Sequence, residues 1–303
     1  MNQRHYDTFT RLDGFKEVLF RFAAKGWLPY HWFNKNLPSP EQLSKAELPI
    51  KLEIVSHCWN YSDFLTYQLS SLIKYDFKDV EVTHTLFYSE EDVATSKVLE
   101  FFSSQQKPRL TWNFIALPKE QLFRRAIGRN IAAKQSKADW LWFTDCDVVF
   151  HEGSLDALAR ELQGRQDALV YPGKMQATEL LAKNDPLLQK VKQKPAVREV
   201  DMEKFSDRSF SRATGPIQIV HGDVARACGY CHDLKVYQKT MPRWSKCYDD
   251  RAFRWLINSQ GVPINVPNVL FIRHAEKGRY HQGSKISLFR KSIRRIKSRL
   301  IGR

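Results

Sequence analysis

An apolar stretch, WLWFTDCDVVF at residues 140–150, contains two aspartates one residue apart, Asp145 and Asp147. Aspartate is seldom fully buried without a partner, because an unpaired charge in apolar surroundings is costly. On an extended chain side chains alternate with a period of two, so both carboxylates are expected to point the same way. Two such carboxylates offer hard oxygen ligands to a divalent cation. The spacing therefore indicates a metal site, and a solvated Asp-rich turn after a strand is the ordinary alternative.

The elements that must position these aspartates alternate between strands and helices. We predict strands at residues 51–60, 79–88, 109–117 and 138–150, with helices at residues 62–75, 91–105 and 121–137 between them. This alternation is typical of βαβ units and a mostly parallel sheet. Ligands bind such sheets beyond the carboxyl ends of the strands, and both aspartates fall there.

The remaining chain divides into three parts. Residues 1–50 are expected to form a helical extension, amphipathic around residues 15–24, and a linker rich in Trp and Pro. Residues 51–278 form the main α/β domain, whose second half contains predicted helices and strands and a polar region without a clear pattern. These further elements are predicted at residues 154–163 (helix), 168–172 (strand), 249–261 (helix) and 268–274 (strand), and the polar region covers residues 174–213. Residues 279–303 are predicted to form a basic amphipathic helix.

The net charge of +15, from 48 basic and 33 acidic residues, indicates an anionic partner. No run approaches the roughly 20 apolar residues of a membrane span, and the first residues lack the pattern of a secretory signal. Five cysteines, an odd number, favour a reducing compartment. We therefore expect a cytoplasmic protein, peripheral on the inner face of the plasma membrane.

The membrane expectation comes from residues 285–303, which hold eight Lys or Arg and no acidic residue. Their apolar residues repeat at a spacing of three and four, as an in-plane helix on anionic lipid requires. Packing of this stripe on the protein's own core is the alternative. We expect no nucleic-acid partner, because the sequence has no aromatic-basic RNA-binding signature, zinc finger or helix-turn-helix pattern.

Several motifs occur in a fixed order along the chain: CWN after the first strand, RRAIGRN before TDCD, then YDDRAFRWL and RH. Together, over about residues 51–278, they resemble the GT-A glycosyltransferases of the large family-2 type. The resemblance implies a GT-A (Rossmann-like), mostly parallel sheet flanked by helices, in a single main domain with helical N- and C-terminal extensions. It also implies transfer of a sugar from a nucleotide sugar, with a UDP-sugar expected, to a glycan or lipid-linked acceptor. The anomeric centre is expected to be inverted.

The resemblance assigns roles residue by residue. Asp145, Asp147 and His274 correspond to ligands of a divalent metal, Mn2+ or Mg2+. Asp250 corresponds to the catalytic base, and Asp249 stands where the family has Glu. The positions that correspond to nucleotide-sugar contacts are His57, Trp59, Asn60, Ser89, Glu90, Glu91, Arg124, Arg129 and Asp145. We also expect Trp244 to stack on an acceptor sugar, with core packing as its alternative.

Physical chemistry fits these assignments. A departing diphosphate gains charge, which a metal and basic side chains stabilise, and the attacking hydroxyl must give its proton to a base. The dipole of the predicted helix at residues 249–261 favours the carboxylate form of Asp250 by about 0.3–1 kcal/mol. An N-cap role for Asp250 is the ordinary alternative.

Other functions fit less well. The motif CGYCH at residues 228–232 allows haem attachment or, with Cys247, a zinc site, but a single C-x-x-C is a weak signal. A phosphatase of the D-x-D-G-T type would need Thr where Val149 stands. A nucleotidyltransferase would need a Gly-rich loop after the first strand, where the sequence is SHCWNYSDF. A non-catalytic basic module that binds sugar or nucleic acid is the remaining alternative.

Overall fold

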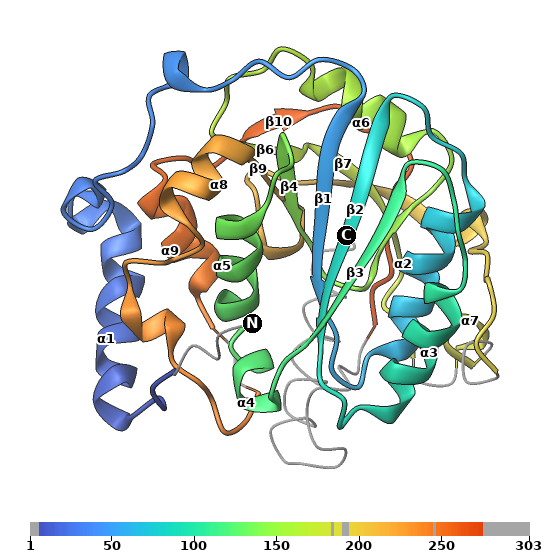
Figure 1. Ribbon diagram of the computed structural model, residues 1–303, viewed down its shortest axis with the longest axis horizontal. Helices are drawn as coiled ribbons and strands as arrows, with labels where there is room; N and C mark the ends of the chain where they lie inside the picture. The colour runs from blue at the N-terminus through green and yellow to red at the C-terminus, as the bar shows by residue number, and fades with distance from the viewer. Residues whose placement is uncertain (1–5, 183–184, 190–193, 245–246, 275–303) are drawn as a thin grey trace.

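A seven-stranded mixed sheet forms the centre of the molecule, with strand order β10-β6-β9-β4-β1-β2-β3 (Figure 1). The computed structural model describes residues 6–182, 185–189, 194–244 and 247–274. Strands β1, β2, β3 and β4 are mutually parallel, whereas β9 runs antiparallel between β4 and β6. The strands are β1 (Ile50–His57), β2 (Val80–Tyr88), β3 (Leu110–Ala116), β4 (Trp140–Phe143), β6 (Leu169–Pro172), β9 (Gln218–His221) and β10 (Val262–Ile264).

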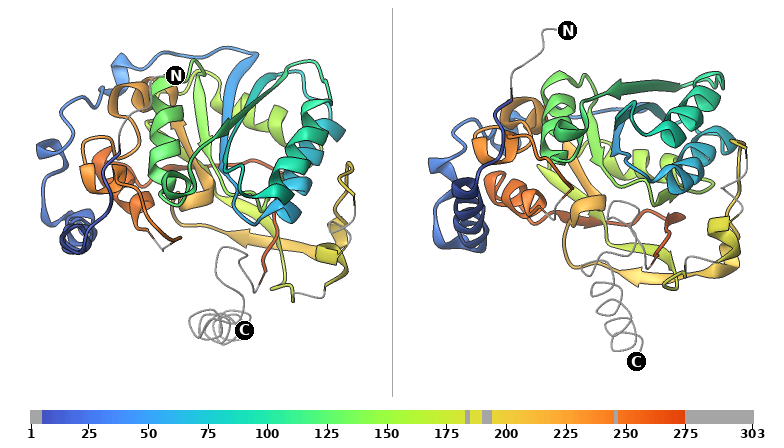
Figure 2. Two further views of the ribbon diagram at one scale, coloured as in Figure 1. Left: turned by 60° about the horizontal axis from the view of Figure 1, so that its bottom comes forward. Right: turned by 90° about the horizontal axis from the view of Figure 1, so that it is seen from below.

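Helices cover both faces of this sheet (Figures 1 and 2). The first four strands and the intervening helices confirm the predicted βαβ pattern, but the single helix predicted at residues 121–137 is divided into two helices. The helices of the main domain are α2 (Ser62–Lys74), α3 (Val93–Ser103), α4 (Lys119–Leu122), α5 (Arg125–Gln135), α6 (Ser154–Leu162), α7 (Pro186–Gln189), α8 (Gly222–Cys228) and α9 (Asp249–Leu256). Short 3-10 turns lie at Met202–Lys204, Gly215–Ile217 and Lys235–Gln238.

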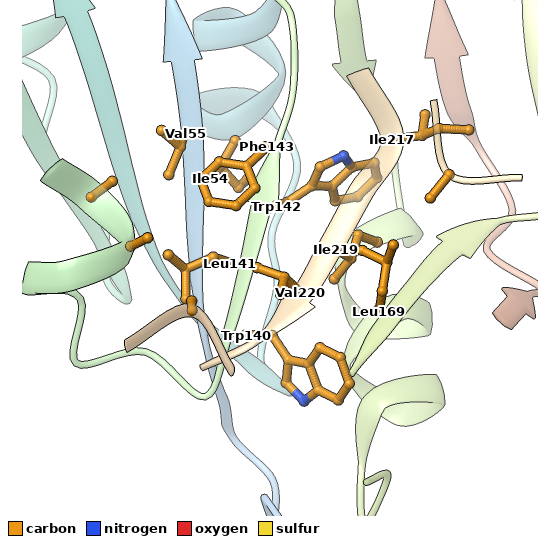
Figure 3. Close-up of a cluster of buried hydrophobic side chains, with 14 of the residues drawn as sticks. Ile54, Val55, Trp140, Leu141, Trp142, Phe143, Leu169, Ile217, Ile219 and Val220 are labelled. Carbon is orange, nitrogen blue, oxygen red and sulfur yellow. The ribbon is translucent and has the colours of Figure 1, made fainter. Parts of the chain in front are cut away.

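The core lies where β1, β4, β9 and β6 meet. Trp140, Trp142 and Phe143 of β4 are fully buried among aliphatic side chains of the neighbouring strands (Figure 3). All four residues of β4 are buried, as a central strand with both faces covered requires. The first four residues of the apolar run at residues 140–150 are therefore the central strand of the large sheet.

A second, four-stranded sheet has the order β5-β11-β7-β8. It consists of β5 (Val148–Phe150), β7 (Lys174–Thr178), β8 (Phe205–Ser209) and β11 (Val269–Phe271). The polar region at residues 174–213, where no element was predicted, supplies β7 and the edge strand β8. The single strand predicted at residues 138–150 is wrong, because the chain ends β4 at Phe143 and enters the second sheet at Val148.

The N-terminal segment begins with α1 (Arg11–Phe22), continues through a π-helical turn at Ala23–Trp27, and ends with 3-10 turns at Tyr30–Trp32 and Pro40–Gln42. It lies against α9 at one side of the molecule (Figures 1 and 2). Trp255 donates its indole N–H to the carbonyl of Leu28 at 3.0 Å, and Asn34 donates to the carbonyl of Leu256 at 2.9 Å. Among the described residues, no helix is long and apolar enough to cross a bilayer.

Close approach of α5 to the ends of β1 and β2 depends on one glycine. A Cβ atom at Gly128 would lie 2.3 Å from Nε2 of His57 and 2.9 Å from the ring of Phe87. Those two rings stack with their centroids 5.0 Å apart, so neither can move aside without disturbing the other. Gly128 therefore sets the distance between the helix and the sheet.

We expect Gly128→Ala to lower the free energy of unfolding by about 1–3 kcal/mol, since overpacking exceeds the gain in helix propensity. Gly14→Ala, in α1, is the matched control, because a Cβ there meets nothing within 4 Å. That substitution should stabilise by about 0.5–1 kcal/mol. Urea unfolding measures both, and a Gly128→Ala protein as stable as wild type would contradict the packing argument.

Candidate active site

Asp145 and Asp147 lie on the turn that joins β4 of the large sheet to β5 of the small one. We call residues 145–148 the aspartate turn; the N–H of Val148 donates to the carbonyl of Asp145 at 3.2 Å. Because the chain turns here, the expectation that the two carboxylates share one direction is wrong. Asp145 accepts from Arg125 at 2.7 Å, whereas Asp147 faces Tyr61, whose hydroxyl lies 3.2 Å from Oδ2.

A buried glutamine holds the aspartate turn in place. The amide of Gln68, on α2, donates to the carbonyls of Asp145 at 3.0 Å and of Val148 at 2.9 Å. Its Oε1 accepts from Ser56 at 2.9 Å and from Nε2 of His84 at 3.2 Å. The sequence reasoning missed Gln68, although an amide among apolar residues on a buried helix was the available signal.

The residues predicted as metal ligands come together only in part. His274 lies with Nε2 3.5 Å from Oδ2 of Asp147 and also contacts the hydroxyl of Tyr61. Oδ1 of Asp147 is buried with no hydrogen-bond partner among the described residues. Within the described ranges no group of three or more His, Cys, Asp or Glu side chains is arranged to hold a metal, since Asp145 turns to Arg125 instead. The buried free oxygen beside an imidazole nevertheless suits a divalent cation.

A second acidic pair stands at the start of α9. Asp249 is fully buried, and both of its carboxylate oxygens lack a hydrogen-bond partner within the described structure. Asp250 remains a quarter exposed, with Oδ2 3.6 Å from the guanidinium of Arg254. Tyr248 occupies the N-cap position, so Asp249 and Asp250 belong to the first turn of the helix. The N-cap alternative for Asp250 is therefore wrong.

Arg125 connects the two acidic groups. Burial opposes its charge, but the nearby carboxylates of Asp145, Asp249 and Asp250 outweigh that effect and raise the pKa of its guanidinium. Its side chain is 18% exposed and can therefore meet a ligand. The structure thus places a cation between the aspartate turn and α9, where the sequence reasoning assigned none.

The two predicted arginines have other surroundings. Arg124 pairs with Glu17 of α1 and donates to the thiol of Cys247 at 3.0 Å. Arg129 is fully buried and donates to the hydroxyl of Tyr230 at 2.7 Å and to the carbonyl of Gly215 at 3.1 Å. These contacts give both side chains a structural role, and their predicted contacts with nucleotide stay predictions.

Aromatic rings line the region after β1. Trp59 meets Phe123 edge to face with centroids 5.1 Å apart, and Phe123 meets Trp244 in the same manner at 6.0 Å. Phe123 thus joins the residue predicted to contact the nucleotide base to the one predicted to stack on the acceptor. His57 is buried against Phe87.

The loops after β1 and β2 are tied by an aspartate that the sequence reasoning did not select. Asp92 accepts from the backbone N–H of Asn60 at 2.6 Å and caps α3 through Thr95. Asn60 adopts a left-handed conformation with φ 51°. Of the three predicted contacts beside it, Ser89 is buried, Glu90 is exposed, and Glu91 pairs with Lys119 at 2.7 Å.

The cysteines of the CGYCH motif do not form a metal cluster in the described structure. Cys228, Cys231 and Cys247 are free thiols, and Cys231 donates to the backbone carbonyl of Asp249 at 3.4 Å. Burial raises the pKa of the Cys231 thiol well above its ordinary value, so it stays protonated. These residues support the start of α9.

A sequence model of the family described as "Glycosyl transferase family 2" matches residues 54–180, which run from the second half of β1 through the aspartate turn to the end of β7. Residues 54–180 are similar to glycosyl transferase family 2. The resemblance predicted from the motifs is thereby confirmed over these residues, and the mixed sheet flanked by helices agrees with the predicted fold class. No curated protein sequence matches the chain.

Solved structures that are similar to this chain include the 1–349 fragment of TarS from S. aureus, at 15% identity and a TM-score of 0.43, covering 75% of this chain and 61% of that one. Another is the mannosyltransferase PcManGT from Pyrobaculum calidifontis in complex with GDP-Man and Mn2+. It is 14% identical with a TM-score of 0.43, over 94% of this chain and 73% of that one. The same TarS fragment in complex with UDP-GlcNAc has 15% identity and a TM-score of 0.42, over 78% of this chain and 61% of that one. The chain thus spans less than two thirds of the TarS fragment.

The network beneath the aspartate turn predicts a pH dependence. Burial lowers the pKa of His84 to about 3, so the folded protein keeps this imidazole neutral while the unfolded chain takes up a proton below about pH 6.5. Stability is therefore lost as the pH falls through this window, by about 2 kcal/mol at a pH of about 5.

His84→Gln keeps a hydrogen-bond donor near Gln68 and removes the titrating group. We expect the free energy of unfolding of this variant to depend less on pH between neutrality and a pH of about 5 than that of wild type. Urea titrations at both pH values measure the difference. Equal pH slopes for the two proteins would show that His84 is not held neutral by burial.

Proposed function

We propose that the chain is a metal-dependent glycosyltransferase that moves a sugar from a UDP-sugar to a hydroxyl of a glycan or lipid-linked acceptor, with inversion at the anomeric carbon. The observation that carries this proposal is the convergence of the aspartate turn and the start of α9 on Arg125. The family match over residues 54–180 supports the reaction class.

Donor binding is proposed at the carboxyl ends of β1, β2 and β4. Parallel sheets bind ligands at this edge, and here it carries Trp59, Asn60 and the aspartate turn. Arg125 supplies a positive charge toward a diphosphate, and a partly exposed arginine presents several N–H donors for phosphate oxygens. Binding of a diphosphate to Arg125 would release Asp145 from its ion pair.

Asp250 is proposed as the base that accepts the proton of the attacking hydroxyl. It is the partly exposed member of the acidic pair, so an acceptor can reach it, and Arg254 orients its carboxylate from one turn along the helix. Asp249 is fully buried and therefore out of an acceptor's reach, and its catalytic role stays a prediction.

Asp147 and His274, joined by Asp145 once it leaves Arg125, are the residues that would hold a divalent cation. When bound, such a cation supplies Lewis-acid stabilisation of the charge on the departing diphosphate. Gln68 keeps the backbone of the turn in position through the carbonyls of Asp145 and Val148, so only the side chain of Asp145 has to turn toward the cation.

Asp250→Asn is expected to lower turnover by about 10²–10⁴-fold, because the amide cannot accept the proton, while nucleotide-sugar binding stays nearly unchanged. Asp233→Asn, at an exposed position, is the matched control. Release of UDP from a panel of UDP-sugars with candidate acceptors measures turnover, and calorimetric titration measures binding. Turnover near the wild-type level in Asp250→Asn would refute the assignment of the base.

Asp145→Asn should weaken the binding of nucleotide sugar in the presence of Mn2+ and leave metal-free binding less affected, because one cation ligand is lost. A thermal-shift series with nucleotide sugar, with Mn2+, and with both together separates these effects. Wild type is expected to be stabilised most by the combination. If Asp145→Asn shows the same combined stabilisation as wild type, the metal assignment fails.

A further inference from the structure

Helix α1 packs on the protein through its charged side. Asp13, 1% exposed, accepts from Lys239 at 3.1 Å, and Glu17 pairs with Arg124. Phe20 is the main apolar contact, with its ring 6.4 Å from that of Trp255. Ion pairs therefore attach this helix to the domain.

The opposite side of α1 is apolar and exposed. Seven of the eleven large hydrophobic side chains exposed among the described residues lie within residues 12–32. Five of them lie on α1 at a spacing of three and four residues, which places them on one side of the helix. Phe15 and Trp27 are each 75% exposed. We call this patch the α1 face; its residues are Leu12, Phe15, Val18, Leu19, Phe22, Trp27 and Trp32.

A cavity of about 570 Å³ at the end of α1 is lined by five cationic side chains. One of them, Lys25, lies over the ring of Phe22 of the α1 face, 5.1 Å from its centroid. The described residues that line the cavity include no acid. Two of its cations come from the N-terminal segment and two from α9; together they are Arg21, Lys25, Arg212, Arg251 and Arg254. Arg21 and Arg251 both stack on the ring of Tyr248, at 4.5 and 5.8 Å from its centroid. We call this cavity the basic pocket.

We propose that the α1 face docks the protein on an anionic lipid bilayer, with the basic pocket taking lipid phosphate groups. Helices that lie in the plane of a membrane place Phe, Leu and Trp among the acyl chains and Lys and Arg against the headgroups. The α1 face and the cations next to it present this arrangement. The net charge of +15 adds attraction to anionic lipid.

Charge favours a bilayer over a second copy of the chain. A two-fold contact through the α1 face would bring the same surface of both copies together, and with it Arg21 and Lys25 of each. The lining of the basic pocket among the described residues offers no acid to neutralise them. A surface of lipid phosphates supplies the missing negative charge.

Sedimentation of the full chain with vesicles tests the proposal. Vesicles of phosphatidylcholine with phosphatidylglycerol should bind at least about tenfold more tightly than vesicles of phosphatidylcholine alone. Phe15→Ser with Leu19→Ser should weaken binding to the anionic vesicles by at least about tenfold, because both apolar side chains are lost from the acyl region. Val93→Ser, at a side chain 61% exposed on α3, should bind as wild type.

A second variant tests the charges. Arg21→Gln with Lys25→Gln should lower binding to the anionic vesicles by about tenfold and affect binding to neutral vesicles less. Lys97→Gln, exposed on α3, is the matched control. Acyl chains carrying bromine should quench the fluorescence of wild type more than that of Trp27→Phe, which locates the α1 face in the bilayer without a destabilising substitution.

Three outcomes would overturn the proposal. Both double variants could sediment as wild type, which would assign any lipid binding to another part of the chain. Quenching by brominated lipid could be the same in wild type and Trp27→Phe. Light scattering could also show that Phe15→Ser with Leu19→Ser converts a dimer to a monomer while vesicle binding is unchanged, which would assign the α1 face to a second copy.

Discussion

Repulsion among carboxylates is the constraint on which the site depends. Asp145 comes from the turn after β4, and Asp249 and Asp250 come from the start of α9, yet all three act on the guanidinium of Arg125. Like charges gathered in a half-buried space would drive these elements apart without a cation between them. Arg125 therefore joins the part of the chain that matches the glycosyltransferase family to the part that follows it. Its guanidinium also occupies the position between these carboxylates where a metal ion or the phosphates of a ligand are proposed to bind.

The geometry of the aspartate turn follows from the change of sheet at this point. A strand that continued from residue 140 to 150 would have pointed both aspartates to one side, but β4 is needed in the centre of the large sheet and β5 in the small one. The turn between them exposes backbone carbonyls to the interior. Gln68 satisfies two of these carbonyls, and His84 and Ser56 orient Gln68 in turn. The backbone of the turn is thus fixed by uncharged groups behind it, and the carboxylates take their directions from Arg125 and Tyr61.

Much of this arrangement can be predicted from sequence, where hydrophobic periodicity is strong. Periodicity gave β1 to β4 with their helices, and the order of the strands brought Asp145, Asp147 and the predicted helix of Asp250 to one edge. Hydrophobic periodicity did not predict β7 and β8. Strand β8 is an exposed edge strand whose side chains are mostly polar. Contacts that join distant segments, such as His274 with Asp147, were reached through the resemblance and not through the pattern of residues.

The choice among the arginines shows why site residues are harder to predict than elements. Successive residues on a helix point about 100° apart, so Arg124, Arg125 and Arg129 cannot all face one ligand. Their directions depend on where the helix begins. Helix α4 ends before Phe123, and α5 begins after Arg124, so these two residues are outside both helices. That break turns Arg124 to Glu17 and leaves Arg125 to meet Asp145. A sequence motif alone does not show which of these arginines points toward Asp145.

The same pairing explains the orientation of α1. Periodicity alone would favour burying Phe15 and Leu19, but the surface of the domain at this place presents Lys239 and Arg124. A buried arginine without a partner is more costly than an exposed phenylalanine, so the acidic side of the helix turns inward and the apolar side outward. Arg124 thus helps to position the α1 face, whereas its neighbour in sequence, Arg125, belongs to the candidate active site. Arg254 lines the basic pocket and also lies 3.6 Å from Asp250. The basic pocket therefore adjoins the candidate active site.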